Sequence, residues 1–266
     1  MRGISAKSLA DVLAAVDAAT GSTGDLGAEL FGAVAVLDGA PALRRVLTDP
    51  STEDEAKAGL AAQVFGGKVG ADAVAVIETA ARGRWGSSRD LTDGLETAGV
   101  SALVAAADAA GELDALETEL FEVGRLVRSD AELRQVVSDR SVATDAKATL
   151  LASLVGGKVT GPTLALATQA AAARTGSFER AIAAFGETVA ARRHRLLAEV
   201  RVAAELGATE TDRLARALAA KYGREVHLNI IVDPSVLGGI AVSVGDESVD
   251  GSMSTRLENA RRRLAG

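Results

Sequence analysis

A stretch of 27 residues occurs twice in this chain and limits the possible folds more than any other feature. The copies are LRRVLTDPSTEDEAKAGLAAQVFGGKV, which begins at Leu43, and LRQVVSDRSVATDAKATLLASLVGGKV, which begins 90 residues later at Leu133. Of the 27 positions, 14 are identical, whereas chance would give roughly 2 to 3. We therefore predict that most of the chain is a duplicated unit of about 90 to 100 residues.

Both copies are predicted to be helical, because their apolar side chains recur at intervals of three and four residues. The first helix is expected over residues 4–19, where Leu9, Val12, Leu13 and Val16 share one face. Each copy should form a bundle of five or six helices. In each copy an aspartate–serine pair should start a helix. A glycine pair should end that helix in the left-handed conformation. These are Asp49 with Ser51, Asp139 with Ser141, Gly66-Gly67 and Gly156-Gly157.

The pattern changes to alternating strands from residue 199. Residues 226–232 and 240–244 alternate apolar and other side chains, and a helical stripe follows residue 252. An Asp-Pro pair should stop the first of these strands, since proline cannot donate to the ladder, and a Gly-Gly pair should permit a turn. An Asp-Gly pair should support a turn and a helix start. The residues of this structural motif are Asp233, Pro234, Gly238, Gly239, Asp250 and Gly251.

The predicted fold is therefore mainly α with a small α/β C-terminal module. Two tandem helical bundles should be followed by a β-α-β-β-α domain. The expected limits are residues 1–100 for the first bundle, 101–195 for the second and 196–266 for the module.

Composition excludes several classes of function. There is no cysteine, so neither disulfides nor thiolate metal sites can form. The net charge of −7 and the 3% of aromatic residues argue against binding to nucleic acid or anionic lipid. No apolar run approaches the roughly 20 residues that span a bilayer, and the first residues lack the features of a signal peptide. We expect a cytosolic protein that meets a membrane only through other subunits.

Three motifs resemble binding or catalytic sites, but each lacks a residue or a spacing that such a site requires. Gly66-Gly67-Lys68 and its copy close a helix and precede valine, so they do not form a phosphate-binding loop. Asp246 and Asp250 resemble the start of a calcium loop, but the twelfth position is Leu257 instead of glutamate. The two histidines, His194 and His227, have no partners at metal-ligand spacing. We therefore predict no cofactor, no metal and no catalytic residue.

The C-terminal sequence resembles the delta subunit of F-type ATP synthases, the family of the oligomycin-sensitivity-conferring protein. The residues that carry the resemblance are Val232 to Ile240, Gly245, Asp246, Asp250 to Ser252, Arg256 and Leu257. The short run Ala6-Lys7-Ser8-Leu9 is similar to the start of that family's first helix. The additional helical copy resembles the enlarged delta subunits of actinobacteria.

The resemblance implies a non-catalytic subunit of the peripheral stalk, at the cytoplasmic face of the cell membrane. Its helical part would hold N-terminal segments of the α subunits, and its C-terminal module would engage the b-type stalk subunit. A helix-binding groove is expected in the first copy. The residues assigned to it are Leu9, Val12, Leu13, Val16, Val74 and Ile77.

Two other functions remain compatible with the residues. One is a helical-repeat adaptor that is unrelated to ATP synthase and docks through its C-terminal module. The other is an enzyme that uses scattered carboxylates such as Asp233, Asp246 and Asp250, which predicts a pocket around them with perturbed pKa values.

Overall fold

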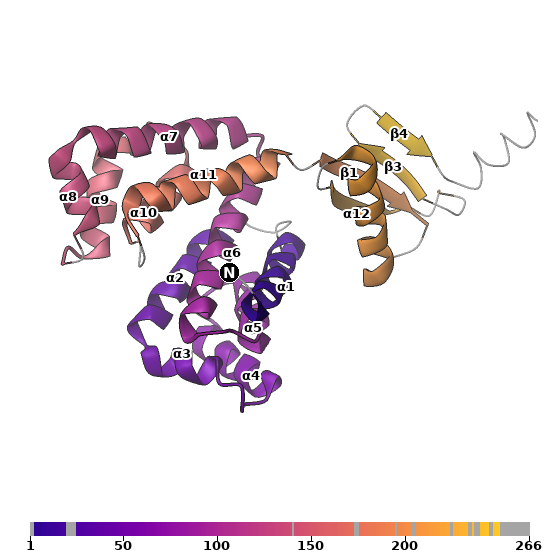
Figure 1. Ribbon diagram of the computed structural model, residues 1–266, viewed down its shortest axis with the longest axis horizontal. Coiled ribbons are helices and arrows are strands. Elements are labelled where there is room, and N and C mark those ends of the chain that lie inside the picture. Colours follow the sequence, from indigo (N-terminus) through magenta and orange to yellow (C-terminus); the bar gives the residue numbers. More distant parts are fainter. Residues whose placement is uncertain are drawn as a thin grey trace, which may run out of the picture. The chain divides into compact units, whose positions relative to one another are not determined.

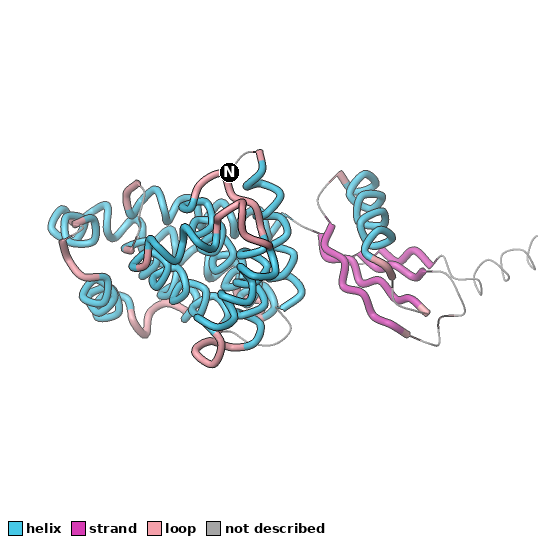
Figure 2. The backbone as a smooth tube through the Cα atoms, turned by 90° about the horizontal axis from the view of Figure 1, so that it is seen from below, coloured by secondary structure: helices cyan, strands magenta, loops and turns pink. Residues whose placement is uncertain are grey.

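The structure is a computed structural model, and it is mainly helical with a small sheet, as the sequence predicts (Figures 1 and 2). The residues that it describes are 3–19, 25–139, 141–172, 176–194, 196–203, 206–223, 226–233, 236, 240–244 and 247–250. The chain divides into two compact units, Met1–Arg192 and Arg193–Gly266.

The helices of the first unit repeat in the same order. The first six are α1 (Ile4–Ala19), α2 (Leu26–Gly39), α3 (Pro41–Leu47), α4 (Asp54–Phe65), α5 (Ala71–Arg82) and α6 (Ser88–Ala109). The next five are α7 (Leu113–Ser129), α8 (Ala131–Ser138), α9 (Thr144–Val155), α10 (Gly161–Ala171) and α11 (Phe178–His194). With the 90-residue offset of the sequence repeat, α2 to α5 correspond to α7 to α10.

Helix α6 belongs to both copies (Figure 1). Adding 90 to the limits of α1 gives 94–109, and subtracting 90 from those of α11 gives 88–104. Helix α6 covers both ranges, because it runs without interruption from Ser88 to Ala109. The last helix of the first copy is therefore also the first helix of the second copy, and the expected limit between residues 100 and 101 falls inside it.

Two hydrophobic cores lie along α6. Its first half contributes Leu91, Leu95 and Ala98 to a core with Leu30 and Trp85. Its second half contributes residues to another core, built mainly by α7 to α11. The members of that core from α6 are Val100, Leu103, Val104 and Ala107, and among its others are Leu116, Leu120, Leu166 and Phe178. Because one helix supplies both cores, the two copies cannot separate without exposing apolar surface.

The repeated glycine pairs end α4 and α9 in the predicted left-handed conformation. Gly67 has φ +70° and Gly157 has φ +76°, which side chains with a Cβ rarely adopt. A Cβ on Gly66 would lie 2.4 Å from the carbonyl oxygen of Ala62, so that glycine is also needed for space. Both predicted helix ends are confirmed.

The aspartate–serine pairs act differently from the prediction. Helix α4 begins only at Asp54, so Asp49 is too far away to cap it. The Asp49 carboxylate instead accepts hydrogen bonds from the Ser51 backbone N–H (2.8 Å) and hydroxyl (2.7 Å), which lower its pKa. Asp139 and Ser141 repeat this arrangement at the same distances. The pair therefore shapes the loop before the helix.

Arg192 near the end of α11 joins three helices. Its side chain is 13% exposed and contacts Asp108 of α6 at 2.8 Å and Asp17 of α1 at 3.3 Å. Arg192 therefore pairs with acidic residues of its own chain.

Replacing Arg192 with alanine should lower the free energy of unfolding by about 1 to 2 kcal/mol, because two carboxylates lose a partly buried partner. Urea unfolding would measure the loss. Arg125→Ala is the control, since Arg125 pairs with Glu122 on the exposed face of α7. That variant should change stability by less than about 0.5 kcal/mol. Equal losses in the two variants would contradict the role of Arg192.

In the described part of the second unit, one helix lies on one face of a four-stranded sheet (Figure 2). Its elements are β1 (Leu196–Val202), α12 (Ala208–Tyr222), β2 (Val226–Val232), β3 (Ile240–Val244) and β4 (Glu247–Asp250). The strand order is β2-β1-β3-β4, with β1 parallel to β2 and antiparallel to β3. Val200, Val202, Val226 and Val242 meet Leu218 in the core of this unit. The strand register pairs Glu199 of β1 with Asn229 of β2 and with Ser243 of β3.

Three details of this unit were not predicted or lie beyond the described residues. Strand β4 was not predicted, and it places Asp250 opposite Ala241 in a ladder. Helix α12 begins after Gly207, whose N–H donates to the Glu210 carboxylate at 3.0 Å, a start that the sequence did not indicate. The motif residues Pro234, Gly238, Gly239 and Gly251 and the expected final helix lie outside the described residues.

Candidate functional site

The residues predicted to bind a partner lie on α1 and α5, which pack against each other. Val12 and Val16 are 0% exposed and Ile77 is 1% exposed, so these three side chains belong to the core. Leu9, Leu13 and Val74 are half-buried. We refer to Leu9, Leu13 and Val74 as the α1–α5 surface, because they are the predicted residues that a partner can reach.

Two serines fix the N-terminal end of α1. The Ser5 hydroxyl donates to the Asp90 carboxylate at 2.5 Å and accepts from the Gly86 N–H at 2.9 Å. The Ser8 hydroxyl donates to the carbonyl oxygen of Arg84 at 2.7 Å. The hydrogen bond from Ser5, with another from Ser87, lowers the pKa of Asp90. Together these contacts set the position of α1 against the segment between α5 and α6.

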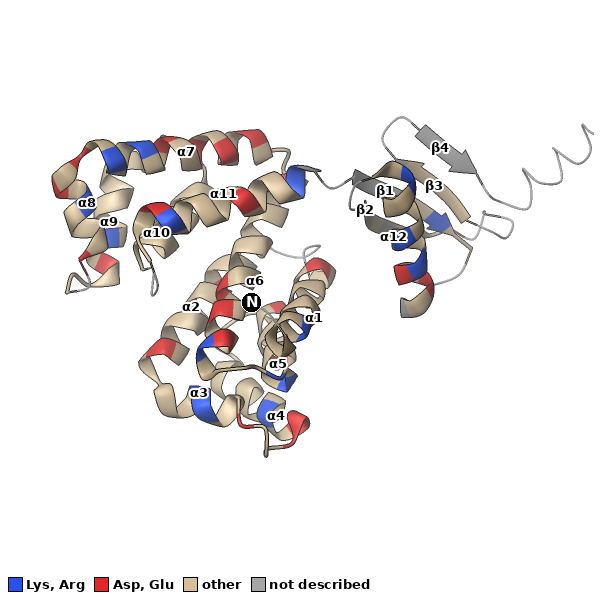
Figure 3. Cartoon of the chain, viewed as in Figure 1, with Lys and Arg blue, Asp and Glu red and all other residues tan. Residues whose placement is uncertain are grey.

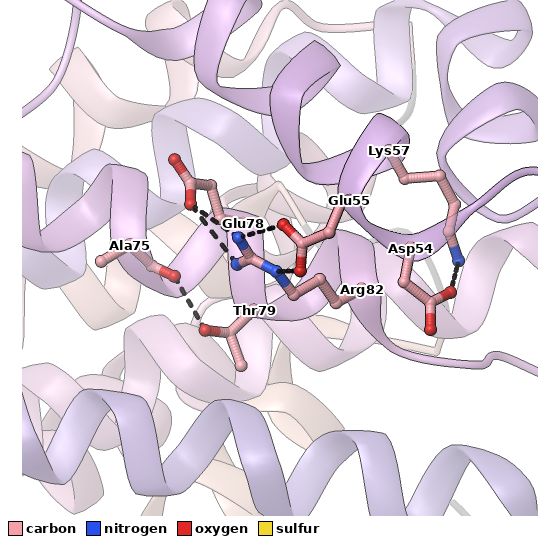
Figure 4. A network of polar contacts seen from close by, with 7 residues as sticks. All are labelled: Asp54, Glu55, Lys57, Ala75, Glu78, Thr79 and Arg82. Carbon is pink, nitrogen blue, oxygen red and sulfur yellow. Dashed lines mark hydrogen bonds and ion pairs between the residues drawn. The ribbon is translucent and has the colours of Figure 1, made fainter.

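An ion pair fixes α5 to α4 (Figure 4). The Arg82 guanidinium donates to both carboxylate oxygens of Glu55, at 2.9 and 3.0 Å, and also contacts Glu78 at 3.4 Å. The hydrogen bonds raise the pKa of Arg82 and lower that of Glu55. Sequence patterns gave no signal for this pair, because its members are 27 positions apart.

The repeated lysines occupy buried positions that the sequence did not predict. Lys57 is 2% exposed and its ammonium lies 2.9 Å from the Asp54 carboxylate (Figure 4). Lys147 is 5% exposed and donates to the carbonyl oxygen of Ala171 at 3.0 Å, while burial lowers its pKa. Both lysines therefore serve the packing of the bundle.

A groove of about 660 Å³ lies between α7 and the end of α9. Its apolar lining includes Leu126 and Leu154, which are 38% and 37% exposed. The corresponding position of the first copy is Phe65, where the groove has Val155. No pattern in the sequence predicts this groove.

Charge does not single out one binding face. Acidic and basic residues are interspersed along the helices of the first unit, and α7 carries both signs (Figure 3). Within the described part of the chain, no three His, Asp or Glu side chains are placed to hold a metal ion. No single helix there is long and apolar enough to cross a membrane; α2 and α3 pass that test only as a pair bent by 107°.

The carboxylates proposed for an enzyme are described only in part. The Asp233 N–H donates to the carbonyl oxygen of Val202 at 2.8 Å, and the Asp233 carbonyl accepts from the Val236 N–H at 3.1 Å. The backbone of Asp233 thus follows the end of β2. Asp246 and the side chain of Asp250 lie outside the described residues, as do the side chains of His194 and His227.

The fold defines the class as a mainly helical protein with a small C-terminal α/β unit. A model of the family described as ATP synthase delta (OSCP) subunit matches residues 100–264. This chain belongs to that family.

Full-length relatives carry the same description. The ATP synthase subunit delta of Streptomyces avermitilis is 44% identical over 268 residues, covering 99% of this chain and 98% of the relative. That of Streptomyces coelicolor is 44% identical over 270 residues, covering 100% and 98%. That of a Nocardioides species is 45% identical over 240 residues, covering 90% and 86%. The family model starts at residue 100, so it is these alignments that extend the similarity to the first copy.

Proposed function

We propose that this protein is a non-catalytic subunit of the peripheral stalk of a proton-translocating F-type ATP synthase. It would link the α subunits at the top of the catalytic head to the b-type stalk subunit at the cytoplasmic face of the membrane, which it reaches only through other subunits. The observation that carries the proposal is the similarity to ATP synthase delta subunits over almost the whole chain.

The shared helix α6 supports a mechanical role. A stator must transmit torque without yielding, and a continuous helix with a core at each end has no flexible joint between the copies. We propose a division into residues 1–100, 101–195 and 196–266, with α6 extending across the first limit. The helical part would bind α, and the C-terminal unit would bind b.

Affinity purification of the full chain from its native source tests this function. Co-recovery of the α, β, γ and b subunits is the expected result. Recovery of the chain with none of them would instead support the helical-repeat adaptor.

The α1–α5 surface is our proposed contact with α. Leu13→Asp should weaken binding of the purified α subunit at least about tenfold, because a carboxylate would be buried against an apolar helix without a partner. Ala14→Asp is the matched control, since residue 14 is exposed on another face of α1. Isothermal titration would measure both affinities. Undiminished binding by Leu13→Asp would remove α1 from the contact.

A further inference from the structure

The groove between α7 and the end of α9, here called the α7–α9 groove, runs along α7. Its lining residues on that helix extend from Thr118 to Ser129, which is about three helical turns or about 16 Å. The rest of its lining comes from the end of α9 and the turn that follows, from Leu154 to Val159. A groove that follows a helix over this length fits the side of another helix.

The apolar part of the groove is more exposed than its counterpart in the first copy. Leu154 is 37% exposed, whereas the equivalent residue Val64 is half-buried and packs against the first core. Leu126 on α7 is exposed to a similar extent, and between the two leucines the lining includes the buried Val123 and Val155. Covering two large apolar side chains is favourable, at about 25 cal/mol per Å² of apolar surface removed from water.

The charges that line the groove favour an acidic occupant. Arg125 pairs with Glu122, and the Glu119 carboxylate accepts three hydrogen bonds from threonines. Lys158 donates to the carbonyl oxygen of Leu154 at 3.3 Å, and no carboxylate in the described part of the chain contacts it. A carboxylate on the occupant would therefore find a cation that has no acidic partner, and this pair would fix the orientation of the occupant.

We infer that the α7–α9 groove binds an amphipathic helix of a partner protein, which covers Leu126 and Leu154 with its apolar face and pairs an acidic residue with Lys158. The groove shares no residue with the α1–α5 surface, because the two lie on different helices. The inference goes beyond the proposed function, since it gives the second copy an interface of its own.

Isothermal titration of the full chain with two synthetic peptides tests the inference. The first is a helical peptide of roughly four turns, with leucines at positions i, i+3 and i+7 and glutamates beside them. The second has lysine in place of each glutamate. The glutamate peptide should bind at least about tenfold more tightly than the lysine peptide, because only its charge complements Lys158.

Reversing the charge of Lys158 provides the decisive variant. Lys158→Glu should weaken binding of the glutamate peptide at least about tenfold and strengthen binding of the lysine peptide. Lys68→Glu is the matched control at the equivalent position of the first copy, and it should leave both affinities within about twofold. Both lysines are exposed, so neither change should prevent folding. No binding of the glutamate peptide, or equal weakening by the two variants, would overturn the inference.

Hydrogen exchange of the wild-type chain with the glutamate peptide locates the site without a variant. The peptide should protect amides in α7 and at the end of α9. Protection confined to α1 and α5 would place the peptide on the α1–α5 surface and would also overturn the inference.

Discussion

Replacing Gly27 with alanine should lower the free energy of unfolding by about 2 kcal/mol, although alanine is the better helix former. The new methyl carbon would lie 2.4 Å from Cγ of Leu103 and 2.9 Å from the carbonyl oxygen of Gly99. The leucine can rotate, but the carbonyl belongs to the backbone of α6 and moves only if the two helices separate. The two cores meet at this position, so both lose contacts.

Gly32→Ala provides the matched control on the same helix. A Cβ on Gly32 meets nothing within 4 Å, and the residue is exposed. This substitution should therefore raise stability by about 0.5 to 1 kcal/mol, as alanine does within a helix. Fluorescence of Trp85, the only tryptophan, would follow unfolding of the first core in urea. A Gly27→Ala protein as stable as the Gly32→Ala protein would contradict the close approach of α2 and α6.

Two glycines of α6 lie close to the expected limit between residues 100 and 101. Glycine within a helix costs roughly 1 kcal/mol relative to alanine, so the sequence there does not favour one continuous helix. In the structure Gly94 and Gly99 leave room for aromatic rings, since a Cβ on either would lie 2.6 Å from Trp85 or Phe31. Tertiary packing thus outweighs a local propensity, and the contacts responsible come from distant parts of the chain.

The site was predictable only to the level of helices. Spacing placed Leu9, Val12, Leu13 and Val16 on one face of α1, but the stripe of an amphipathic helix serves the core before it serves a partner. Its centre, Val12 and Val16, is fully buried, and only its edge remains accessible.

Strand β4 was not predicted for another reason. Its four residues contain one apolar side chain, too few to show a period of two.

Removing the Glu119 side chain should also destabilise the protein strongly. Its carboxylate joins α7 to the start of α10 by accepting from the Thr160 N–H (2.8 Å), the Thr160 hydroxyl (2.8 Å) and the Thr163 hydroxyl (2.6 Å). Thr163 is 0% exposed, so Glu119→Ala would leave buried donors without their charged acceptor. We expect a loss of about 2 to 3 kcal/mol.

The repeat supplies a matched control for this change. Glu29 is the equivalent residue in the first copy, and it accepts a hydrogen bond of 2.8 Å from the Gly70 N–H, where the second copy has Thr160. Glycine has no hydroxyl to donate, so Glu29→Ala should cost only about 1 kcal/mol. Urea unfolding followed by far-ultraviolet circular dichroism would compare the variants. A larger loss for Glu29→Ala would contradict the assignment.

The contribution of Glu119 should depend on pH in a defined direction. Burial raises the pKa of its carboxyl, but the hydrogen bonds from Thr163 and Thr160 lower it more, so the folded-state pKa lies below the ordinary value. Between the two values the unfolded chain binds more protons, and stability rises with pH. The wild-type advantage over Glu119→Gln should therefore be complete above about pH 4.5 and disappear as pH falls through the folded-state pKa. An advantage that grows on acidification would show that the carboxylate is not the stabilising form.

Because α6 supplies both cores, Trp85 in the first core should report the loss of stability caused by Glu119→Gln in the second core. One fluorescence series therefore also tests whether the two copies unfold together.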